Sequence, residues 1–180
     1  DIVAQLKSSR LVKEAIPAGS FRRMKETVGD IDILVITDEP DQVSKLFLKI
    51  VPHVKVWGQG STKISIRTEI GFDMDIRMLP KETYGAALQY FTGSKEHNVK
   101  LRAYAVSKGY KLNEYGLYKG KKLIASKTEQ EVYKALGMEY IEPELRENQG
   151  EIEIALQGNL PKLVEYNSLQ GDLQVQTDWT

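Results

Sequence analysis

Two aspartates lie two positions apart at the start of an apolar segment. Asp30 and Asp32 stand in the sequence GDIDILVIT. In a strand, side chains at this spacing point to the same face, so both carboxylates would project to one side. They would start roughly 7 Å apart along the strand and could lean toward two divalent ions about 4 Å apart. The spacing therefore predicts a two-metal site built on carboxylate oxygens.

A third carboxylate comes from the segment FDMDIRM, where Asp73, Asp75 and Arg77 share a face. Periodicity alone leaves the choice between Asp73 and Asp75 open. A single pair of aspartates of this kind more often marks a surface strand with solvated acids. Two such pairs in neighbouring strands favour a functional interpretation, because an unpaired acid entering an apolar strand is costly.

A possible anion site precedes the first pair. The sequence Gly19-Ser20-Phe21-Arg22-Arg23 predicts a short helix that offers backbone N–H groups, a hydroxyl and a guanidinium to a phosphate. An ordinary helix start with an exposed arginine is an equally good account of this segment alone. The roughly ten residues that separate it from Asp30 suffice for a short helix and a turn, which predicts that phosphate donors and metal ligands face each other.

The composition narrows the chemistry. The 180 residues contain no cysteine and two histidines, and 25 Lys and Arg balance 25 Asp and Glu. Disulfides and thiolate metal sites are excluded, and the zero net charge gives no global sign of nucleic-acid binding. Since no apolar run approaches the ~20 residues of a membrane span and no secretory signal is evident, we expect a soluble, cytoplasmic protein.

The periodicity predicts an α/β (α+β) fold with a mixed sheet and flanking helices, followed by a smaller α+β lobe. Pro17 is expected to end the first helix, two later helices meet near Gly93, and no clear periodicity follows Gln149. The expected helices are 1–14, 41–50, 81–90, 95–109 and 128–137, and the expected strands are 31–36, 54–57, 63–67 and 72–78, with short strand pieces in 111–124.

These motifs resemble the X family of DNA polymerases. GSFRR followed by GDIDIL resembles the nucleotidyltransferase signature of that family, and MDIRMLPKETYGAALQYFTGSKEHNVKLRAYAVSKGYKLNEYGL resembles its third-carboxylate strand and nucleotide-binding lobe. The resemblance covers about residues 15–147, and YFTGS and NEYGL are its most specific parts. It implies a palm at 1–81, a thumb or fingers lobe at 82–147, a linker at 148–170 and the start of a phosphoesterase (PHP) domain at 171–180.

The resemblance also implies roles for individual residues. Asp30, Asp32 and Asp75 would be the catalytic ligands of two Mg²⁺ ions, with Mn²⁺ able to substitute, and Asp73 would be a neighbour. The nucleotide-binding residues would be Gly19, Ser20, Arg23, Gly29, Tyr90, Phe91, Gly93, Lys95 and Asn98, and the DNA-binding residues Lys63 and Arg102. From the pattern alone, Tyr90 and Phe91 fit a core equally well, Lys63 an exposed strand lysine, and Arg77 either charge balance or a partner for an active-site carboxylate.

Some positions depart from the family pattern. Lys95 stands where polymerase beta has an acid, and Val28 stands where it has a hydroxyl residue. Gln174 and Gln176 replace both histidines of the DLHVHT pattern, so a nuclease site there would lack metal ligands. The helix-hairpin-helix region of family members is expected to be absent before Asp1, which predicts weak, salt-sensitive DNA binding.

The resulting prediction is a template-directed DNA polymerase that acts as a monomer on gapped or primed DNA and deoxynucleoside triphosphates, in base excision repair. One alternative is a nucleotidyltransferase that modifies RNA ends, a protein or a small molecule with the same acids. Another is a binding module that keeps the fold without turnover. Templated primer extension separates the first alternative from the prediction.

Overall fold

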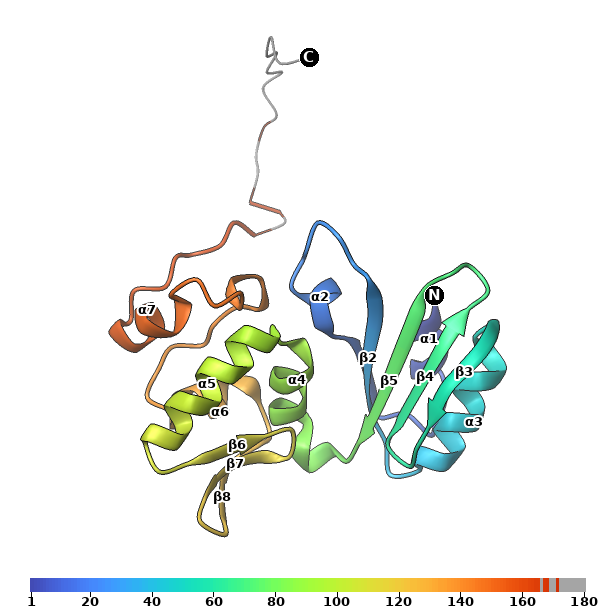
Figure 1. Ribbon diagram of the computed structural model, residues 1–180, viewed down its shortest axis with the longest axis horizontal. Coiled ribbons are helices and arrows are strands. Elements are labelled where there is room, and N and C mark those ends of the chain that lie inside the picture. Colours follow the sequence, from blue (N-terminus) through green and yellow to red (C-terminus); the bar gives the residue numbers. More distant parts are fainter. Residues whose placement is uncertain (166, 169–170, 172–180) are drawn as a thin grey trace.

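The computed structural model describes residues 1–165, 167–168 and 171 of the chain. A mixed sheet in the order β1-β2-β5-β4-β3 forms one lobe (Figure 1). Its strands are β1 (Glu14–Pro17), β2 (Asp30–Ile36), β3 (His53–Gln59), β4 (Lys63–Thr68) and β5 (Asp73–Leu79). β2 and β5 are parallel, and the other neighbouring pairs are antiparallel. The predicted mixed sheet is confirmed.

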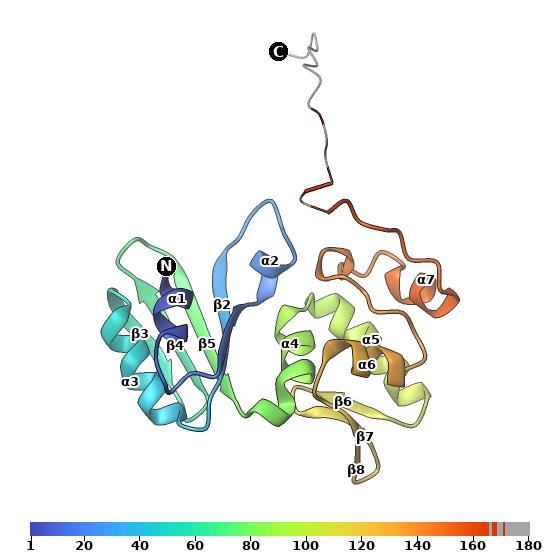
Figure 2. The same ribbon diagram turned by 180° about the vertical axis from the view of Figure 1, so that it is seen from behind.

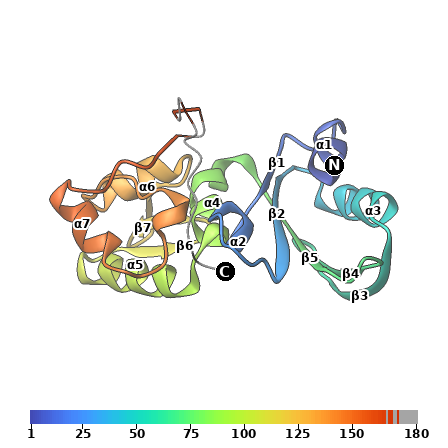
Figure 3. The same ribbon diagram turned by 90° about the horizontal axis from the view of Figure 1, so that it is seen from above.

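Two helices cover one face of this sheet. They are α1 (Ile2–Lys7) and α3 (Pro40–Ile50), seen in front of the strands in Figure 2 and above them in Figure 3. Phe47 of α3 and the inward residues Ile33 and Val35 of β2 are buried together. Each large apolar side chain buried in this way contributes roughly 1.5–3 kcal/mol, so this layer fixes the register of β2.

The second lobe is mostly helical and lies on the other side of β2 (Figure 1). Its elements are η1 (Lys81–Thr83), α4 (Tyr84–Thr92), α5 (Lys95–Ser107), β6 (Lys111–Asn113), β7 (Gly116–Lys119), β8 (Lys122–Ala125), α6 (Glu129–Ala135), η2 (Pro143–Leu145) and α7 (Glu151–Gln157). A core around Leu101, Leu117 and Tyr133 holds them together. The predicted break between two helices falls at Gly93, with φ at 75°.

Two predicted helices need correction, and one helix was missed. The first helix ends at Lys7, residues 8–13 form a turn, and Glu14–Pro17 form the edge strand β1, which is too short to show an alternating pattern. The next long helix begins at Pro40, not at Asp41. Helix α7 was not predicted, because it has fewer than three turns and lies between two glycines; Ile152 and Ala155 nevertheless pack into the second core.

The predicted start of a PHP domain at 171–180, with Gln174 and Gln176, lies outside the described residues except for Gly171. Among the residues that the structure describes, no helix has the length and apolar character needed to cross a membrane.

A buried histidine makes the second lobe sensitive to acid. His97 is fully buried, with Nδ1 2.6 Å from Glu151 Oε1 and Nε2 3.0 Å from the Tyr133 hydroxyl. Burial lowers the pKa of His97 below its ordinary value of 6.5. At a pH between the lowered pKa of folded His97 and the ordinary pKa of an unfolded histidine, the unfolded chain binds a proton that the folded chain does not. Stability therefore rises with pH in this range.

We therefore expect the contribution of neutral His97 to the free energy of unfolding to be complete above the ordinary histidine pKa of about 6.5. This contribution should fall as the pH drops toward the lower pKa of His97 in the folded protein. Denaturant titrations over a pH series measure it. His97→Gln should be less stable overall but should show a flatter pH dependence in this window. An equal slope in both proteins would contradict the assignment.

Candidate active site

The parallel pairing of β2 and β5 brings the predicted acids side by side. Asp30 is in register with Asp73, and Asp32 is in register with Asp75. The same face of β2 continues into Leu34 and Ile36, which are buried against α4. One face of β2 therefore has two roles. The residues at the start of the strand present carboxylates, and those at its end pack against the second lobe.

Asp32 lies in surroundings that disfavour its charged form. Burial, followed by the charges of Asp30 and Asp75, raises the pKa of Asp32 to about 6. A half-buried carboxylate beside two others is destabilised by like charge. Carboxylate oxygens are the ligands that Mg²⁺ and similar hard cations prefer, and a bound cation would relieve the repulsion between these carboxylates. The residues therefore fit a divalent-metal site.

The carboxylates do not converge as they stand. Within the described part of the chain, no group of three or more His, Asp or Glu side chains is arranged to hold a metal ion. Asp75 instead forms an ion pair with Lys63 of β4, with 2.6 Å between Nζ and Oδ2. Asp75 still lies on the polar face of the sheet, since the alternate residues Met74 and Ile76 are the buried ones.

Asp73 is engaged elsewhere. It accepts hydrogen bonds from the indole of Trp57, at 3.0 Å, and forms an ion pair with Arg67 at 3.1 Å. The hydrogen bond from Trp57 and that from Arg67 lower the pKa of Asp73. The surroundings of Asp73 therefore suit a structural carboxylate, and the register with Asp32 favours Asp75 as the third functional acid.

Gly19 lets the chain approach Asp32. It begins helix α2 (Gly19–Arg22) with φ at 57°, a conformation that disfavours side chains. A Cβ atom at this position would lie 2.2 Å from Asp32 Oδ2. The backbone of the predicted phosphate segment thus lies directly against the predicted metal ligand, as the spacing in the sequence indicated.

A pocket of about 370 Å³ joins these elements to the second lobe. All predicted site residues except Gly29, Lys63 and Asp75 line this pocket, and Thr92 lines it as well. The predicted residues in the lining are Gly19, Ser20, Arg23, Asp30, Asp32, Tyr90, Phe91, Gly93, Lys95, Asn98 and Arg102. Gly29 is exposed next to Asp30, while Lys63 and Asp75 lie on the neighbouring strands. Residues that the sequence separates by up to 83 positions, Gly19 and Arg102, thus share one pocket.

The end of α4 shapes the far wall of the pocket. The rings of Tyr90 and Phe91 meet edge to face at 5.2 Å between centroids. Asn98 is buried and donates to the Tyr90 carbonyl at 2.7 Å, and its own carbonyl accepts from Gln89 at 2.7 Å. The guanidinium of Arg102 lies 5.7 Å from the centre of the Tyr90 ring. Asn98 and Arg102 share a helix face, as predicted, and both support Tyr90.

Two arginines tie α2 to the second lobe. Arg22 donates to both carboxylate oxygens of Glu129, at 2.9 and 2.7 Å. Arg23 donates to Glu147 at 2.8 Å and to the Thr92 carbonyl at 2.6 Å. The family resemblance implied a phosphate contact for Arg23. These contacts with Thr92, Glu129 and Glu147 were not predicted, because contacts over 69 to 124 positions leave no local pattern.

Glu129 is the centre of this connection. It is 4 % exposed, and it also accepts from the fully buried Arg146 at 2.6 Å. Burial alone would raise the pKa of Glu129, but the hydrogen bond from Arg22, together with the charge and hydrogen bond of Arg146, holds this pKa below its usual range. Because Glu129 neutralises the partly exposed Arg22 and the fully buried Arg146, its charge helps to hold the two lobes together.

Glu129→Gln should therefore lower the free energy of unfolding by roughly 3 kcal/mol, since it leaves two arginines without a full counter-charge. Chemical denaturation followed by circular dichroism measures the change. Glu131→Gln, at an exposed position of the same helix, is the matched control and should stay within about 0.5 kcal/mol of the wild type. Equal stability of both variants would show that the network carries little energy.

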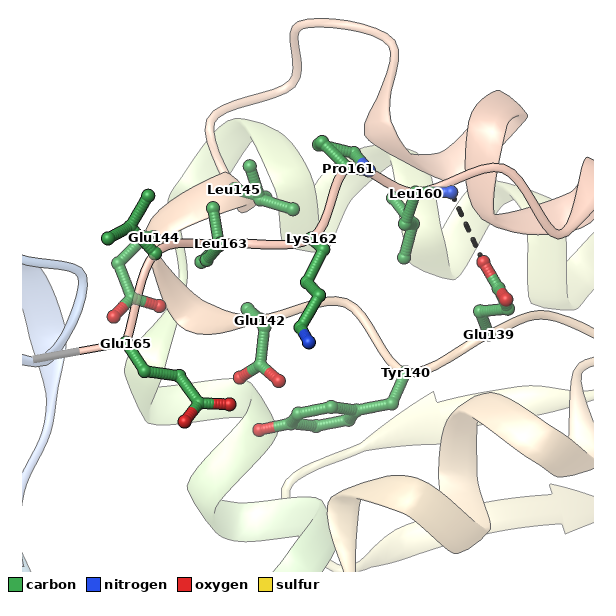
Figure 4. A pocket seen from close by; sticks show the side chains of 11 residues that line it. Glu139, Tyr140, Glu142, Glu144, Leu145, Leu160, Pro161, Lys162, Leu163 and Glu165 are labelled. Carbon is green, nitrogen blue, oxygen red and sulfur yellow. Dashed lines mark hydrogen bonds between the residues drawn. The ribbon is translucent and has the colours of Figure 1, made fainter. Parts of the chain in front are cut away.

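A larger pocket of about 770 Å³ lies away from these residues, between residues 139–145 and 160–165 (Figure 4). Glu139 accepts a hydrogen bond from the Leu160 amide at 3.2 Å across it. Four glutamates line the pocket against one lysine: Glu139, Glu142, Glu144, Glu165 and Lys162. This charge repels a triphosphate, so the smaller pocket beside Asp32 is the candidate active site.

Comparison with known proteins places the chain in a family. A sequence profile of the DNA polymerase beta palm matches residues 2–81, and one of the DNA polymerase beta thumb matches residues 87–147. The two matches together span both lobes that flank the pocket. The chain belongs to the X family of DNA polymerases.

Individual relatives agree with this assignment. The DNA polymerase/3'-5' exonuclease PolX of Bacillus subtilis is 34 % identical over 91 % of this chain, which spans 29 % of that protein. The repair DNA polymerase X of African swine fever virus is 32 % identical over 76 % of this chain and 83 % of its own length. The structure of Leishmania infantum polymerase beta in a ternary P/T complex superimposes with a TM-score of 0.67 at 28 % identity, covering 74 % of this chain and 67 % of that one.

Proposed function

We propose that this chain is the catalytic core of a template-directed DNA polymerase that adds deoxynucleotides to a primer 3′ end during short-gap repair. The observation that carries the proposal is the in-register pairing of Asp32 with Asp75 beside a pocket lined by Gly19, Ser20 and Arg23. Membership of the X family supplies the reaction class.

Asp30, Asp32 and Asp75 are the residues that would hold two Mg²⁺ ions, or Mn²⁺ in their place. When bound, such ions neutralise charge on the transferred phosphoryl group and on the attacking and leaving oxygens. Asp75 draws the proton from, or orients, the primer 3′ hydroxyl. Positioning by the protein then accounts for much of the remaining catalysis.

The pocket residues bind the incoming nucleotide. The Ser20 hydroxyl, the Arg23 guanidinium and the backbone at Gly19 and Gly29 take the triphosphate, and Lys95 adds a cation at the pocket rim. Arg23 exchanges its contacts with Glu147 and Thr92 for phosphate oxygens. Support for this arrangement comes from the common pocket that contains all of these groups except Glu147 and Gly29.

The second lobe selects the sugar and base. The backbone at Gly93 and the rings of Tyr90 and Phe91 lie under the sugar and exclude a ribose 2′ hydroxyl. Asn98 reaches the minor-groove edge of the base after releasing the Tyr90 carbonyl. Arg102 contacts the template strand, and Lys63 lies near the primer.

The proposal extends to organisation and partners. Residues 1–81 act as the palm and 82–147 as the thumb or fingers lobe. Helix α7, within the segment 148–170 that was predicted as a linker, packs into the core of that lobe and belongs to it. The partners are gapped or primed DNA and a deoxynucleoside triphosphate, the protein acts as a monomer, and its location is the cytoplasm. The Leishmania complex, whose title names a P/T complex, supports DNA as a partner.

Primer extension on gapped and open templates, with Mg²⁺ or Mn²⁺, tests the function. We expect each added nucleotide to be dictated by the opposing template base. Addition that ignores the template would instead indicate a nucleotidyltransferase with another substrate. Absence of any extension at high protein and nucleotide concentrations would favour a binding module.

A further inference from the structure

Lys63 is placed where a cation of the active site would act. It begins β4, and its ammonium lies 2.6 Å from Asp75 Oδ2. The side chains of Lys63 and Asp75 are 37 % and 24 % exposed, respectively. The pair is therefore open to solvent on one side, and the lysine can leave without breaking packed structure.

The charges around the acids explain why a cation is held there. Asp30, Asp32 and Asp75 bring three carboxyl groups to adjacent positions on β2 and β5. Arg77, the next residue on the same face, has its guanidinium 5.1 Å from the centre of the Phe91 ring. Lys63, in contrast, contacts a carboxylate oxygen of the group directly, so its positive charge offsets part of the repulsion.

We propose that the Lys63 ammonium is a built-in counter-ion of Asp75, which a divalent cation must displace to bind, so that Lys63 limits the affinity of the site for such cations. The inference rests on the proposed function, because it takes Asp75 as a metal ligand. Lys63 thereby becomes a positioning residue that holds the Asp75 carboxylate before the ions bind. This role differs from the contact with the primer proposed above, and both can belong to one side chain once it is released.

Electrostatics predicts that removing the Lys63 ammonium raises the affinity of the site for divalent cations. An ammonium bound to Asp75 occupies an oxygen that a metal needs, and it repels a divalent ion from a short distance. Removing it leaves the acids with one more uncompensated negative charge, which strengthens the attraction for a divalent ion. The pair also weakens with salt, because it is partly solvent-exposed.

Binding of Mn²⁺ to the full chain, without DNA or nucleotide, tests the inference through calorimetry or the electron paramagnetic resonance of the free ion. The buffer should lie above neutral pH, so that Asp32, with its pKa raised to about 6, is ionised. Lys63→Met should bind Mn²⁺ roughly tenfold more tightly than the wild type. Lys63→Arg keeps the charge and should stay close to the wild type.

Lys55→Met is the matched control. Lys55 lies on β3 of the same sheet, with its ammonium 4.0 Å from the centre of the Trp57 ring. Its removal changes the net charge equally, so a general charge effect would appear in both variants. Mn²⁺ affinity that is unchanged or weaker in Lys63→Met, or equally strengthened in Lys55→Met, would overturn the inference.

Asp75→Asn separates this inference from the proposed function. If it weakens Mn²⁺ binding while Lys63→Met does not strengthen it, the counter-ion role alone fails. If it leaves Mn²⁺ binding unchanged, Asp75 is not a ligand, and both the inference and the assigned catalytic set fail. Circular dichroism of each variant confirms that the comparison is made between folded proteins.

Discussion

Asp75→Ala is expected to lower the rate of templated primer extension by on the order of 10³-fold or more, while nucleotide binding stays largely intact. Asp75 is in register with Asp32 and shares its face of the sheet. Its loss removes both a metal ligand and the group that receives or orients the proton of the 3′ hydroxyl, which are contributions made mainly in the transition state. Single-turnover extension and a separate nucleotide-binding titration measure the two effects.

Asp73→Ala is the control for this substitution. It removes a carboxylate from the same face of the same strand, but Asp73 contacts Trp57 and Arg67. We expect extension within a few-fold of the wild type and a small loss of stability, as for other exposed ion pairs. Undiminished extension by Asp75→Ala, or an equally severe loss with Asp73→Ala, would reverse the assignment of the third acid.

Most of the arrangement of the aspartates on the sheet could be predicted from the sequence. Alternation in GDIDILVIT and FDMDIRM predicted which side chains share a face, and the sheet confirms both strands. Alternation says nothing about which strands are neighbours, so periodicity left the choice between Asp73 and Asp75 open. The family resemblance favoured Asp75, and the parallel pairing of β2 with β5 places Asp75 in register with Asp32. The Lys63–Asp75 contact depends in turn on β4 lying beside β5, which no local pattern encodes.

The ion pairs that connect the two lobes could not be predicted from the sequence either. Arg22 and Arg23 are adjacent, and the family resemblance implied a phosphate contact for Arg23. Their partners Glu129 and Glu147 come from the second lobe. Polar contacts of this kind have no hydrophobic period, and the two-turn helix α7 that closes the same lobe was missed for a related reason: it is too short to show one.

Gly19→Ala is expected to reduce extension by on the order of 10²- to 10³-fold, with a much smaller effect on folding. The new Cβ would lie 2.2 Å from Asp32 Oδ2 and 3.1 Å from its Cγ, so the carboxylate must turn away from its place beside Asp75. Misplacing one metal ligand by about 1 Å is enough for a loss of this size. The positive φ of Gly19, 57°, adds strain of roughly 1–2 kcal/mol for alanine.

Extension rate and free energy of unfolding should be measured on the same preparations, because we expect a large change in the rate and a small change in the stability. Gly58→Ala is the matched control: Gly58 lies in β3, and an added Cβ there meets no atom within 4 Å. It should extend primers at the wild-type rate. If Gly19→Ala instead keeps near-normal extension, then the orientation of the Asp32 carboxylate does not limit the reaction, and the close approach of α2 to β2 serves folding alone.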